Sequence, residues 1–446
     1  MISTKELFKR PLRCISKIPQ RSWITDLSTS RHCQHSSQFS KLEVQPLNLS
    51  FSQDDRTRLA QTRVAYLFPS LKLGNYWHPI LSRFTHIVPQ TRVYTGSWDG
   101  FSRGYEQQFQ LTIVGSAKFF PTEASLAGGY IKNVGYLSPK ILGHLFRLRP
   151  HVIFVSAFSV WTLLSVLVKP LLRWRVVILY DGWSPTYDYQ DSSMRLRVRR
   201  WIAQSSDRVI TNSHNGATYL TDALRVAPDR IQRIPYQVPD VQALNVQSKS
   251  VTSSESTLAI TNHAPQTLRL ITIGQMITRK GIDRLLQALH LLQSRGRINL
   301  HLTCVGSGDA LLDLQSLSRS LQLEKMVDWV GHVPYDRIGE YLTQADVFVF
   351  PTLEDVWGMA PLEAMVWGKP IICSQYSGCA ESMIIEGKTG FQVDPNHPET
   401  IANAIEKFLD RPDWIDLMGE QAKAHISKFS PDTATHALLA LTLELG

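Results

Sequence analysis

Two acidic side chains, Asp355 and Glu363, lie eight positions apart on either side of a short turn. A carboxylate accepts two hydrogen bonds side by side, which suits the neighbouring hydroxyls of a ribose or of another sugar. Gly358 lies in the turn, and Pro361 fits the first turn of a helix, because proline lacks the N–H group that has no partner there. We therefore expect two acids around the beginning of a helix.

The elements that must position these acids also form an anion site. The apolar run 347–350 predicts a strand buried on both faces, and Leu362, Met365 and Val366 have helical spacing. The first N–H groups of a helix lack partners and carry the positive end of its dipole, so a phosphate binds well there. Phosphates at the helix end and hydroxyls on the acids together indicate a nucleotide-linked sugar.

Two series of alternating strands and helices are expected on either side of a polar segment. Residues 61–240 and residues 267–428 are each predicted to form a Rossmann-like domain. Residues 241–266, rich in Ser, Thr, Asn and Gln, indicate a linker or insertion. Residues 1–60 indicate a poorly ordered extension, although their basic start also resembles a transit peptide. Residues 429–446 predict a helix that crosses back to the first domain.

Composition narrows the class of partner. The chain has 446 residues, a net charge of +9 and a pI of about 9.3, which favours polyanions. It lacks zinc-finger spacing and a basic zipper, so we expect no nucleic acid but instead a donor phosphate and an anionic membrane surface. Its five cysteines are too scattered for a disulfide framework. A cytoplasmic protein is expected, either free or peripheral on the inner face of the membrane.

Two segments raise the question of membrane contact. Residues 152–168 are apolar and uncharged, but they divide into a strand, a polar junction and a helix, which favours a buried core over a membrane span. Residues 192–203 place four arginines around apolar residues that include Trp201. This pattern is typical of a helix that docks on anionic lipid and equally of a solvated helix with Trp201 in the core. Both interpretations remain open.

The segment from Asp355 onward resembles the signature of the retaining GT-B glycosyltransferases of the glycosyltransferase 4 family. That signature is Glu-x7-Glu followed by Ala-Met, and Asp355 replaces the first Glu. The resemblance covers residues 62–446. It implies an α/β GT-B fold, with two Rossmann-like doubly wound parallel-sheet domains facing a central cleft. It also implies transfer of a sugar from a nucleoside-diphosphate sugar to a hydroxyl acceptor on a glycan, glycolipid or small molecule, without metal or other cofactor.

The resemblance also assigns site residues. The turn Arg279-Lys280-Gly281 is similar to the family's Arg-Lys-Gly, whose lysine contacts the donor diphosphate; preorganised donors of this kind contribute about 3–4 kcal/mol each. Asp355 is then expected to hold donor-sugar hydroxyls and Glu363 the ribose. Further donor-binding residues implied are Gly274, Gly358, Met359, Ala360, Val330, His332, Glu381 and Gly74, and the acceptor side is assigned to Asn75 and Asp181.

Three positions depart from the family pattern, and they keep two alternatives open. Gln275 stands where the family has Arg, Tyr180 where it often has a sugar-contacting His, and Asp355 where it has Glu. A nucleotide-sugar epimerase of the same fold would convert the donor without an acceptor. A non-catalytic protein would bind the donor and turn over nothing.

Overall fold

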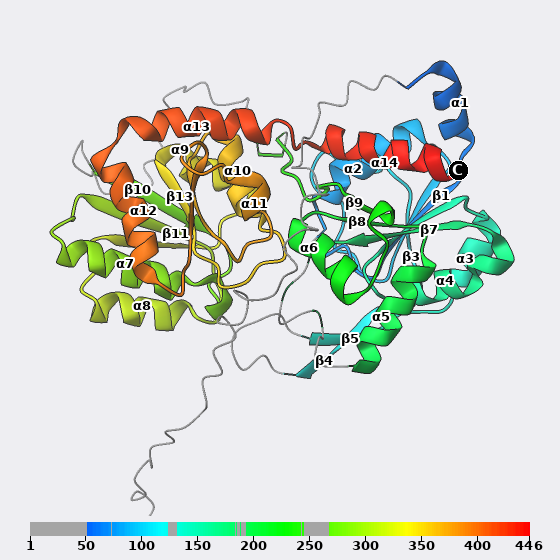
Figure 1. The fold of residues 1–446 in the computed structure, drawn as a ribbon, viewed down its shortest axis with the longest axis horizontal. Coiled ribbons are helices and arrows are strands. Elements are labelled where there is room, and N and C mark those ends of the chain that lie inside the picture. The colour runs from blue at the N-terminus through cyan, green and yellow to red at the C-terminus, as the bar shows by residue number, and fades with distance from the viewer. Residues whose placement is uncertain are drawn as a thin grey trace, which may run out of the picture. The chain divides into compact units, whose positions relative to one another are not determined.

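The structure, a computed structural model, contains a large parallel β-sheet in each half of the chain (Figure 1). It describes residues 51–72, 74–123, 132–182, 184, 188, 193–241, 243–244 and 267–446, all of which belong to one compact unit. The predicted extension up to residue 50 and residues 245–266 of the predicted linker lie outside this described part. The two sheets confirm the predicted α/β class with two Rossmann-like domains.

The first domain is built on a seven-stranded sheet of order β3-β2-β1-β6-β7-β8-β9, in which all neighbouring strands are parallel. Its strands are β1 (Val64–Phe68), β2 (Thr91–Thr95), β3 (Leu111–Ile113), β6 (Val152–Ser156), β7 (Arg175–Tyr180), β8 (Arg208–Thr211) and β9 (Ile231–Arg233). Its helices are α1 (Gln53–Gln61), α2 (Trp77–Ile87), α3 (Ile141–Leu148), α4 (Val160–Leu172), α5 (Ser193–Ser205) and α6 (His214–Thr218), followed by the π-helix Tyr219–Ala223 and the 3₁₀ turn Pro228–Arg230. Strands β4 (Lys118–Glu123) and β5 (Lys132–Tyr136) form a separate antiparallel pair.

The second domain is built on a six-stranded parallel sheet of order β12-β11-β10-β13-β14-β15. Its strands are β10 (Leu268–Ile273), β11 (Leu300–Val305), β12 (Val327–Gly331), β13 (Val347–Phe350), β14 (Ile371–Ser374) and β15 (Gly390–Val393). Its helices are α7 (Ile282–Ser294), α8 (Leu311–Ser320), α9 (Ile338–Gln344), α10 (Met359–Val366), α11 (Ala380–Met383), α12 (Pro398–Asp410) and α13 (Asp413–Ile426), with 3₁₀ turns at Thr278–Lys280 and Tyr335–Arg337.

Alternating side chains of the strands give the first sheet two buried faces. On β1, Ala65 and Leu67 join the core that α3, α4 and α5 cover. Tyr66 points to the other face, where its ring packs edge-on against Phe84 of α2 at 5.3 Å between centroids. Because both faces are covered by helices, the strand is apolar throughout instead of alternating with polar residues.

The apolar run 152–168 divides as predicted into β6 and α4. The break is stabilised by Ser159, whose hydroxyl accepts the N–H of Thr162 while Thr162 reaches back to the N–H of Ser159, a capping box that begins the helix. In the described part of the chain, no helix is long and apolar enough to cross a membrane.

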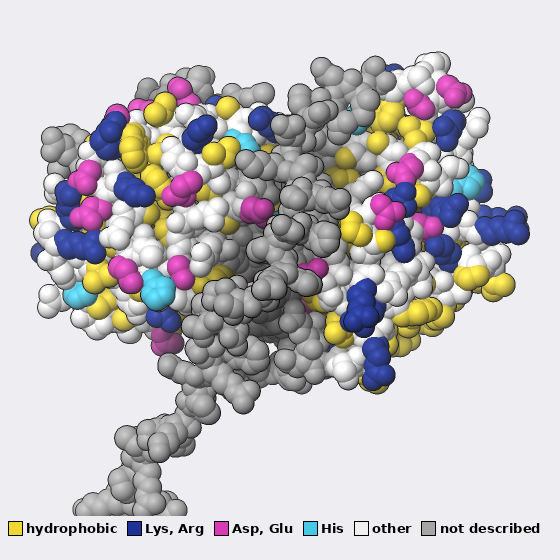
Figure 2. Space-filling view, in the orientation of Figure 1, with side chains coloured by type: hydrophobic (Ala, Val, Ile, Leu, Met, Phe, Trp, Pro, Cys, Tyr) yellow, Lys and Arg dark blue, Asp and Glu magenta, His cyan; other side chains and the backbone are white. Residues whose placement is uncertain are grey.

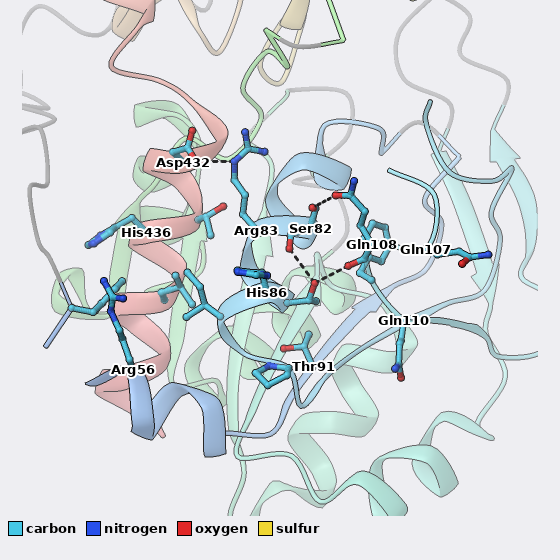
Figure 3. Close-up of a pocket in the computed structure, with 17 residues that line it drawn as sticks. Arg56, Ser82, Arg83, His86, Thr91, Gln107, Gln108, Gln110, Asp432 and His436 are labelled. Atoms are coloured by element: carbon cyan, nitrogen blue, oxygen red, sulfur yellow. Dashed lines mark hydrogen bonds and ion pairs between the residues drawn. The ribbon is translucent and has the colours of Figure 1, made fainter. Parts of the chain in front are cut away.

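Helix α14 (Pro431–Leu445) follows the second domain in sequence but packs on the first. It lies beside α2, and Arg83 of α2 donates to Asp432 of α14 at 2.7 Å (Figures 1 and 3). At the other end, Arg58 of α1 donates to the carbonyl of Leu443 at 3.2 Å. The first domain is therefore completed by a segment that the chain supplies after residue 430.

The structure differs from the sequence prediction at both ends of the first domain. Residues 53–61, assigned to the extension, form α1; the helix was missed because only Leu59 is buried, which gives no apolar periodicity, yet Ser52 and Asp55 form a capping box at its start. At the other end, strand β9 lies on the edge of the sheet, and it is too short and too polar to be predicted.

Candidate active site

The turn Arg279-Lys280-Gly281 is fixed to the loop that follows β13. Gly281 has a φ of 64°, and a Cβ there would lie 2.1 Å from the carbonyl oxygen of Pro351. No other residue fits this close approach. The carbonyl of Arg279 accepts the N–H of Leu353 at 2.8 Å and the hydroxyl of Thr352 at 3.1 Å. These contacts between residues about 75 positions apart place the two predicted motifs in direct contact.

Three charged side chains meet at this junction. The ammonium of Lys280 donates to the carboxylate of Asp355, and Arg279 Nη1 lies 3.5 Å from the same carboxylate. Arg279 is buried and also donates to the carbonyl of Glu354 at 2.7 Å. Arg279 is thus held by the backbone, whereas Lys280 is held mainly by the charge of Asp355. Lys280 also lies 4.9 Å from the centre of the Phe350 ring.

Gly358 turns the chain into α10. Its φ is 102°, and a Cβ there would lie 2.8 Å from Ser377 Oγ and 2.9 Å from the Phe350 ring. No side chain caps α10, so the backbone N–H groups of Met359 and Ala360 at its start have no side-chain acceptor from the N-cap residue. A helix start of this kind next to two cations suits an anion.

Glu363, one turn further along α10, is buried and its carboxylate is hydrogen-bonded by the hydroxyl of Tyr335. Burial raises the pKa of Glu363 to about 7, and the hydrogen bond from Tyr335 only partly opposes this. The same tyrosine lies against Asp240, which follows the first domain. Glu363 therefore changes its protonation state near neutral pH.

The loop after β14 covers Asp355 from the opposite side. The N–H of Asp355 donates to the carbonyl of Tyr376 at 3.1 Å, and the N–H of Gly378 donates to the carbonyl of Asp355 at 2.9 Å. Glu381, predicted to bind the donor, follows this loop on α11 and is exposed.

Three strand ends bring the remaining donor-side residues to one edge of the second sheet. A Cβ on Gly306, after β11, would lie 1.8 Å from the carbonyl oxygen of Gly274, after β10. The N–H of Gly306 donates to the carbonyl of Gly331 at 2.7 Å, which places Val330 and His332 at the same edge. Ligands of open α/β sheets bind at this carboxyl edge. His332 is exposed and Val330 is half-buried.

The acceptor-side residues form a separate, largely neutral network. Asp181 accepts the hydroxyl of Tyr236 at 2.7 Å, and its carbonyl accepts the side-chain amide of Asn212 at 2.9 Å. Burial raises the pKa of Asp181, and the bond from Tyr236 opposes it. The hydroxyl of Tyr76 accepts the amide of Gln237 at 3.0 Å.

The two predicted residues next to Tyr76 contribute mainly backbone. Asn75 is exposed, and its carbonyl caps the N–H of His78 at 3.0 Å. Gly74 is buried against Leu71. Its N–H donates to the carbonyl of Leu71 at 3.1 Å, and this hydrogen bond closes a turn.

Direct contacts join the two domains beside these networks. Trp357, fully buried between Asp355 and Gly358, donates to the carbonyl of Gln237 at 2.8 Å. The hydroxyl of Ser184 donates to the carboxylate of Glu354. A Cβ on Gly182 would lie 2.4 Å from the carbonyl oxygen of Val356, so the two backbones approach closely. The sequence did not predict these contacts; the one available signal was a large aromatic residue in a turn between acids.

The burial of Tyr180 and the positions of the cavities both bear on the predicted site. Tyr180, which stands where the family has a sugar-contacting His, is 2% exposed and stacks on Tyr219 at 5.7 Å in the first core, so its ring is a packing residue. A cavity of about 890 Å³ lies between α2 and α14 (Figure 3), and none of the predicted site residues lines it. The cavity beside Lys280 and Gly274 is about 10 Å³.

Two family models and several curated proteins match this chain. The family "Glycosyltransferase Family 4" matches residues 90–239, and "Glycosyl transferases group 1" matches residues 254–425. A D-inositol 3-phosphate glycosyltransferase of Streptomyces griseus is 27% identical over 270 residues, 56% of this chain and 56% of that protein. One of Pseudarthrobacter chlorophenolicus is 29% identical over 226 residues, 50% and 52% of the two chains. The chain thus spans about half the length of the curated relatives it matches.

A solved structure agrees over a longer stretch. The Anabaena protein HepE, crystallised in complex with UDP, superposes with a TM-score of 0.68 at 19% identity and covers 86% of this chain and 100% of its own. The same protein has been crystallised with UDP-glucose. Its likeness shows the fold. The superposition shows that this chain has the GT-B fold. The two family matches are consecutive and together cover residues 90–239 and 254–425, so this chain belongs to the glycosyltransferase 4 family.

Proposed function

We propose that this protein is a retaining glycosyltransferase that moves a sugar from a nucleoside-diphosphate sugar to a hydroxyl acceptor. The observation that carries the proposal is the contact between Lys280 and Asp355, made by two motifs about 75 positions apart and fixed by Gly281 against Pro351. A lysine beside an acid at a helix start offers one group for phosphate and one for hydroxyls. The binding of UDP and UDP-glucose by HepE supports this class of donor.

In the proposed reaction, the donor diphosphate takes the place of Asp355 at the Lys280 ammonium. Asp355, released from the ion pair, then accepts hydroxyls of the donor sugar. Arg279 stays with the carbonyl of Glu354, 3.5 Å from Asp355, and adds a second positive charge. The uncapped start of α10 supplies N–H donors to the phosphates. These groups are in position before the reaction and stabilise the charge of the leaving diphosphate.

The bond changes follow front-face attack. The acceptor oxygen bonds to the anomeric carbon on the face from which the bond to the diphosphate oxygen breaks. The acceptor proton passes to that phosphate oxygen, so no side chain serves as nucleophile and the configuration is retained. Asp181, Asn75 and Gly74 are proposed to line the acceptor side. We propose that Glu363 exchanges the hydroxyl of Tyr335 for those of the ribose, and that Glu381, Val330 and His332 contact the rest of the donor.

The test is the substitution Lys280→Ala in the full chain. We expect turnover to fall by about 10²–10³, because one preorganised donor to the leaving group contributes about 3–4 kcal/mol. Lys325→Ala, which removes an exposed lysine of the same domain, is the matched control. Donor consumption is measured with and without an acceptor panel. Near-normal transfer by Lys280→Ala would remove the assigned role, and donor conversion without any acceptor would indicate an epimerase.

A further inference from the structure

Large apolar side chains project from one side of the first domain, at neighbouring places on α4 and α5. On α4, Leu171 is 82% exposed and Leu167 is 53% exposed. On α5, Trp201 is 44% exposed and Val198 is 45% exposed. The two helices pack together, and Lys169 of α4 donates to the carbonyl of Ser205 of α5 at 3.0 Å. An isolated exposed leucine needs no explanation, but a cluster of such residues indicates an interaction surface.

The structure decides the two interpretations of residues 192–203. Arg199 bonds to Asp188 at 2.8 Å and Arg200 to the carbonyl of Ala223 at 2.8 Å, so these two arginines attach α5 to the domain. Trp201 points outward and is not a core residue. The solvated-helix interpretation is therefore wrong about Trp201, and the outward face of α5 is more apolar than its sequence indicates.

Basic hollows adjoin the projecting side chains. Two cavities, of about 540 and 590 Å³, share Arg173, Trp174 and Arg175 in their linings. The first also reaches Leu167 and Trp201, and the second reaches Leu171 and two more arginines, Arg63 and Arg149. Within the described part of the chain, neither lining contains an Asp or Glu side chain.

The positions of these arginines explain why the charge stays at the surface. Arg149 and Arg173 are the C-caps of α3 and α4, both in the left-handed conformation, where a cation interacts favourably with the negative end of a helix dipole. Arg175 pairs with Asp207 at 3.2 Å, and Asp207 also pairs with Lys169. The surface is therefore a group of apolar projections beside concave sites that suit phosphate groups.

We propose that this surface, which consists of Leu167, Leu171, Leu172, Val198 and Trp201 with Arg149 and Arg173, docks on an anionic phospholipid bilayer. Leucine and tryptophan side chains enter the boundary between headgroups and acyl chains, and the arginines bind lipid phosphates. Figure 2 shows hydrophobic side chains (yellow) and Lys and Arg (dark blue) side by side over α4 and α5. A net charge of +9 adds long-range attraction to the same membrane.

A bilayer fits this surface better than a protein partner does. The arginines lie in hollows around projecting side chains, whereas a protein interface has a flat apolar centre with a polar rim. The surface also lies at the amino ends of the strands, since Arg63 precedes β1 and residues 171–174 precede β7. The candidate active site lies at the carboxyl ends. Docking therefore leaves the site uncovered, and it does not depend on the proposed reaction.

The experiment measures sedimentation of the full chain with vesicles of phosphatidylcholine alone or with one third phosphatidylglycerol. We expect binding to the anionic vesicles, weakened by salt. Arg149→Ala and Arg173→Ala should each lower the partition coefficient about fivefold, the equivalent of about 1 kcal/mol per basic residue. Leu171→Asp should lower it about tenfold or more, because an inserted leucine is withdrawn from water.

Matched controls lie on α8 in the second domain. Leu312→Asp changes a leucine that is 74% exposed, and Arg319→Ala removes an exposed arginine. Both should sediment like the unmodified protein, and thermal unfolding checks that all variants are folded. The proposal is overturned if the control variants lose as much binding, if Leu171→Asp loses none, or if neutral vesicles bind equally well. It is also overturned if the α4 and α5 variants keep vesicle binding and lose only association with another protein.

Discussion

The donor side and the acceptor side of the candidate site are built in opposite ways. On the donor side, Arg279, Lys280 and Asp355 bring three full charges together in a buried junction. On the proposed acceptor side, the carboxylate of Asp181 accepts the hydroxyl of Tyr236 and its backbone carbonyl accepts the amide of Asn212. Both of these donors are uncharged.

This difference shows what each side is suited to do. A lysine that is neutralised by a carboxylate can exchange that carboxylate for a phosphate, because one anion replaces another. The carboxylate of Asp181 accepts a neutral hydroxyl, so no anion is there to be replaced by another. In the proposed function, the donor side is an ion pair that the diphosphate displaces, and the acceptor side is a network of neutral donors around Asp181.

The largest expected effect is on stability, and it distinguishes Arg279 from Lys280. Arg279→Ala should lower the free energy of unfolding by about 3 kcal/mol, because it removes a buried charge that Asp355 and the carbonyl of Glu354 both contact. Lys280→Ala should lower it by only about 1 kcal/mol, since Lys280 is held mainly by one ion pair. Urea unfolding of both variants measures this. Equal losses would contradict the distinction between a structural and a displaceable cation.

The next effect is a dependence of stability on pH. The pKa of Glu363 is raised from 4.5 to about 7, so the native state keeps a proton that the unfolded chain releases. Its contribution to stability is complete below pH 4.5 and is lost as the pH rises to about 7, by up to about 3 kcal/mol. Glu363→Gln, which cannot ionise, should flatten this part of the curve. The check is urea unfolding between pH 4 and pH 8, in steps of about one unit. An unchanged slope in the variant would assign the dependence to another group.

A smaller effect tests displacement directly. Asp355→Asn leaves Lys280 without its anionic partner, so a free nucleoside diphosphate should bind about tenfold more tightly, the equivalent of about 1.4 kcal/mol. Sugar transfer should nevertheless fall, since the amide is a poorer acceptor for hydroxyls. Calorimetric titration with a nucleoside diphosphate measures the first quantity, and a transfer assay measures the second. Weaker diphosphate binding in Asp355→Asn would mean that Asp355 orients Lys280 and does not compete with the ligand.

The smallest effect belongs to the acceptor side. Tyr236→Phe removes one hydroxyl donor from Asp181 and should lower the free energy of unfolding by about 1 kcal/mol, with donor affinity unchanged. Tyr136→Phe, at an exposed tyrosine, serves as the control and should change neither quantity. A loss of donor affinity in Tyr236→Phe would show that the acceptor side is energetically coupled to the donor side, which contradicts the separation seen in the contacts.

The second domain follows from its sequence far more closely than the first. Strand β13 occupies residues 347–350, where the apolar run of β-branched and aromatic residues predicts it, because it is a buried parallel strand that ends before Pro351. In the first domain, residues 80–150 contain short runs broken by Gly and Pro, and no period identifies β2, β3 or α3. Their place in the sheet depends on pairing with β1, which is a long-range contact.

In the candidate site, the sequence predicts residue types but not their partners. Spacing within the motifs identifies Lys280, Asp355 and Glu363 as candidate site residues. The family resemblance predicts that they lie in one site. The partners of the other acids come from far away: Glu354 contacts Ser184, and Glu363 contacts Tyr335. Neighbouring acids in one loop point to different places because the backbone of the loop is fixed by the 3₁₀ turn and by residues 376–378. No local pattern encodes that choice.

Helix α14 has a consequence for how the protein is made. During synthesis the first domain leaves the ribosome early, but the helix that covers α2 and contacts α1 is encoded after residue 430. Until then, the apolar surface that Leu438 and Leu439 bury has no cover. The first domain therefore completes its packing only after α14 has been synthesised.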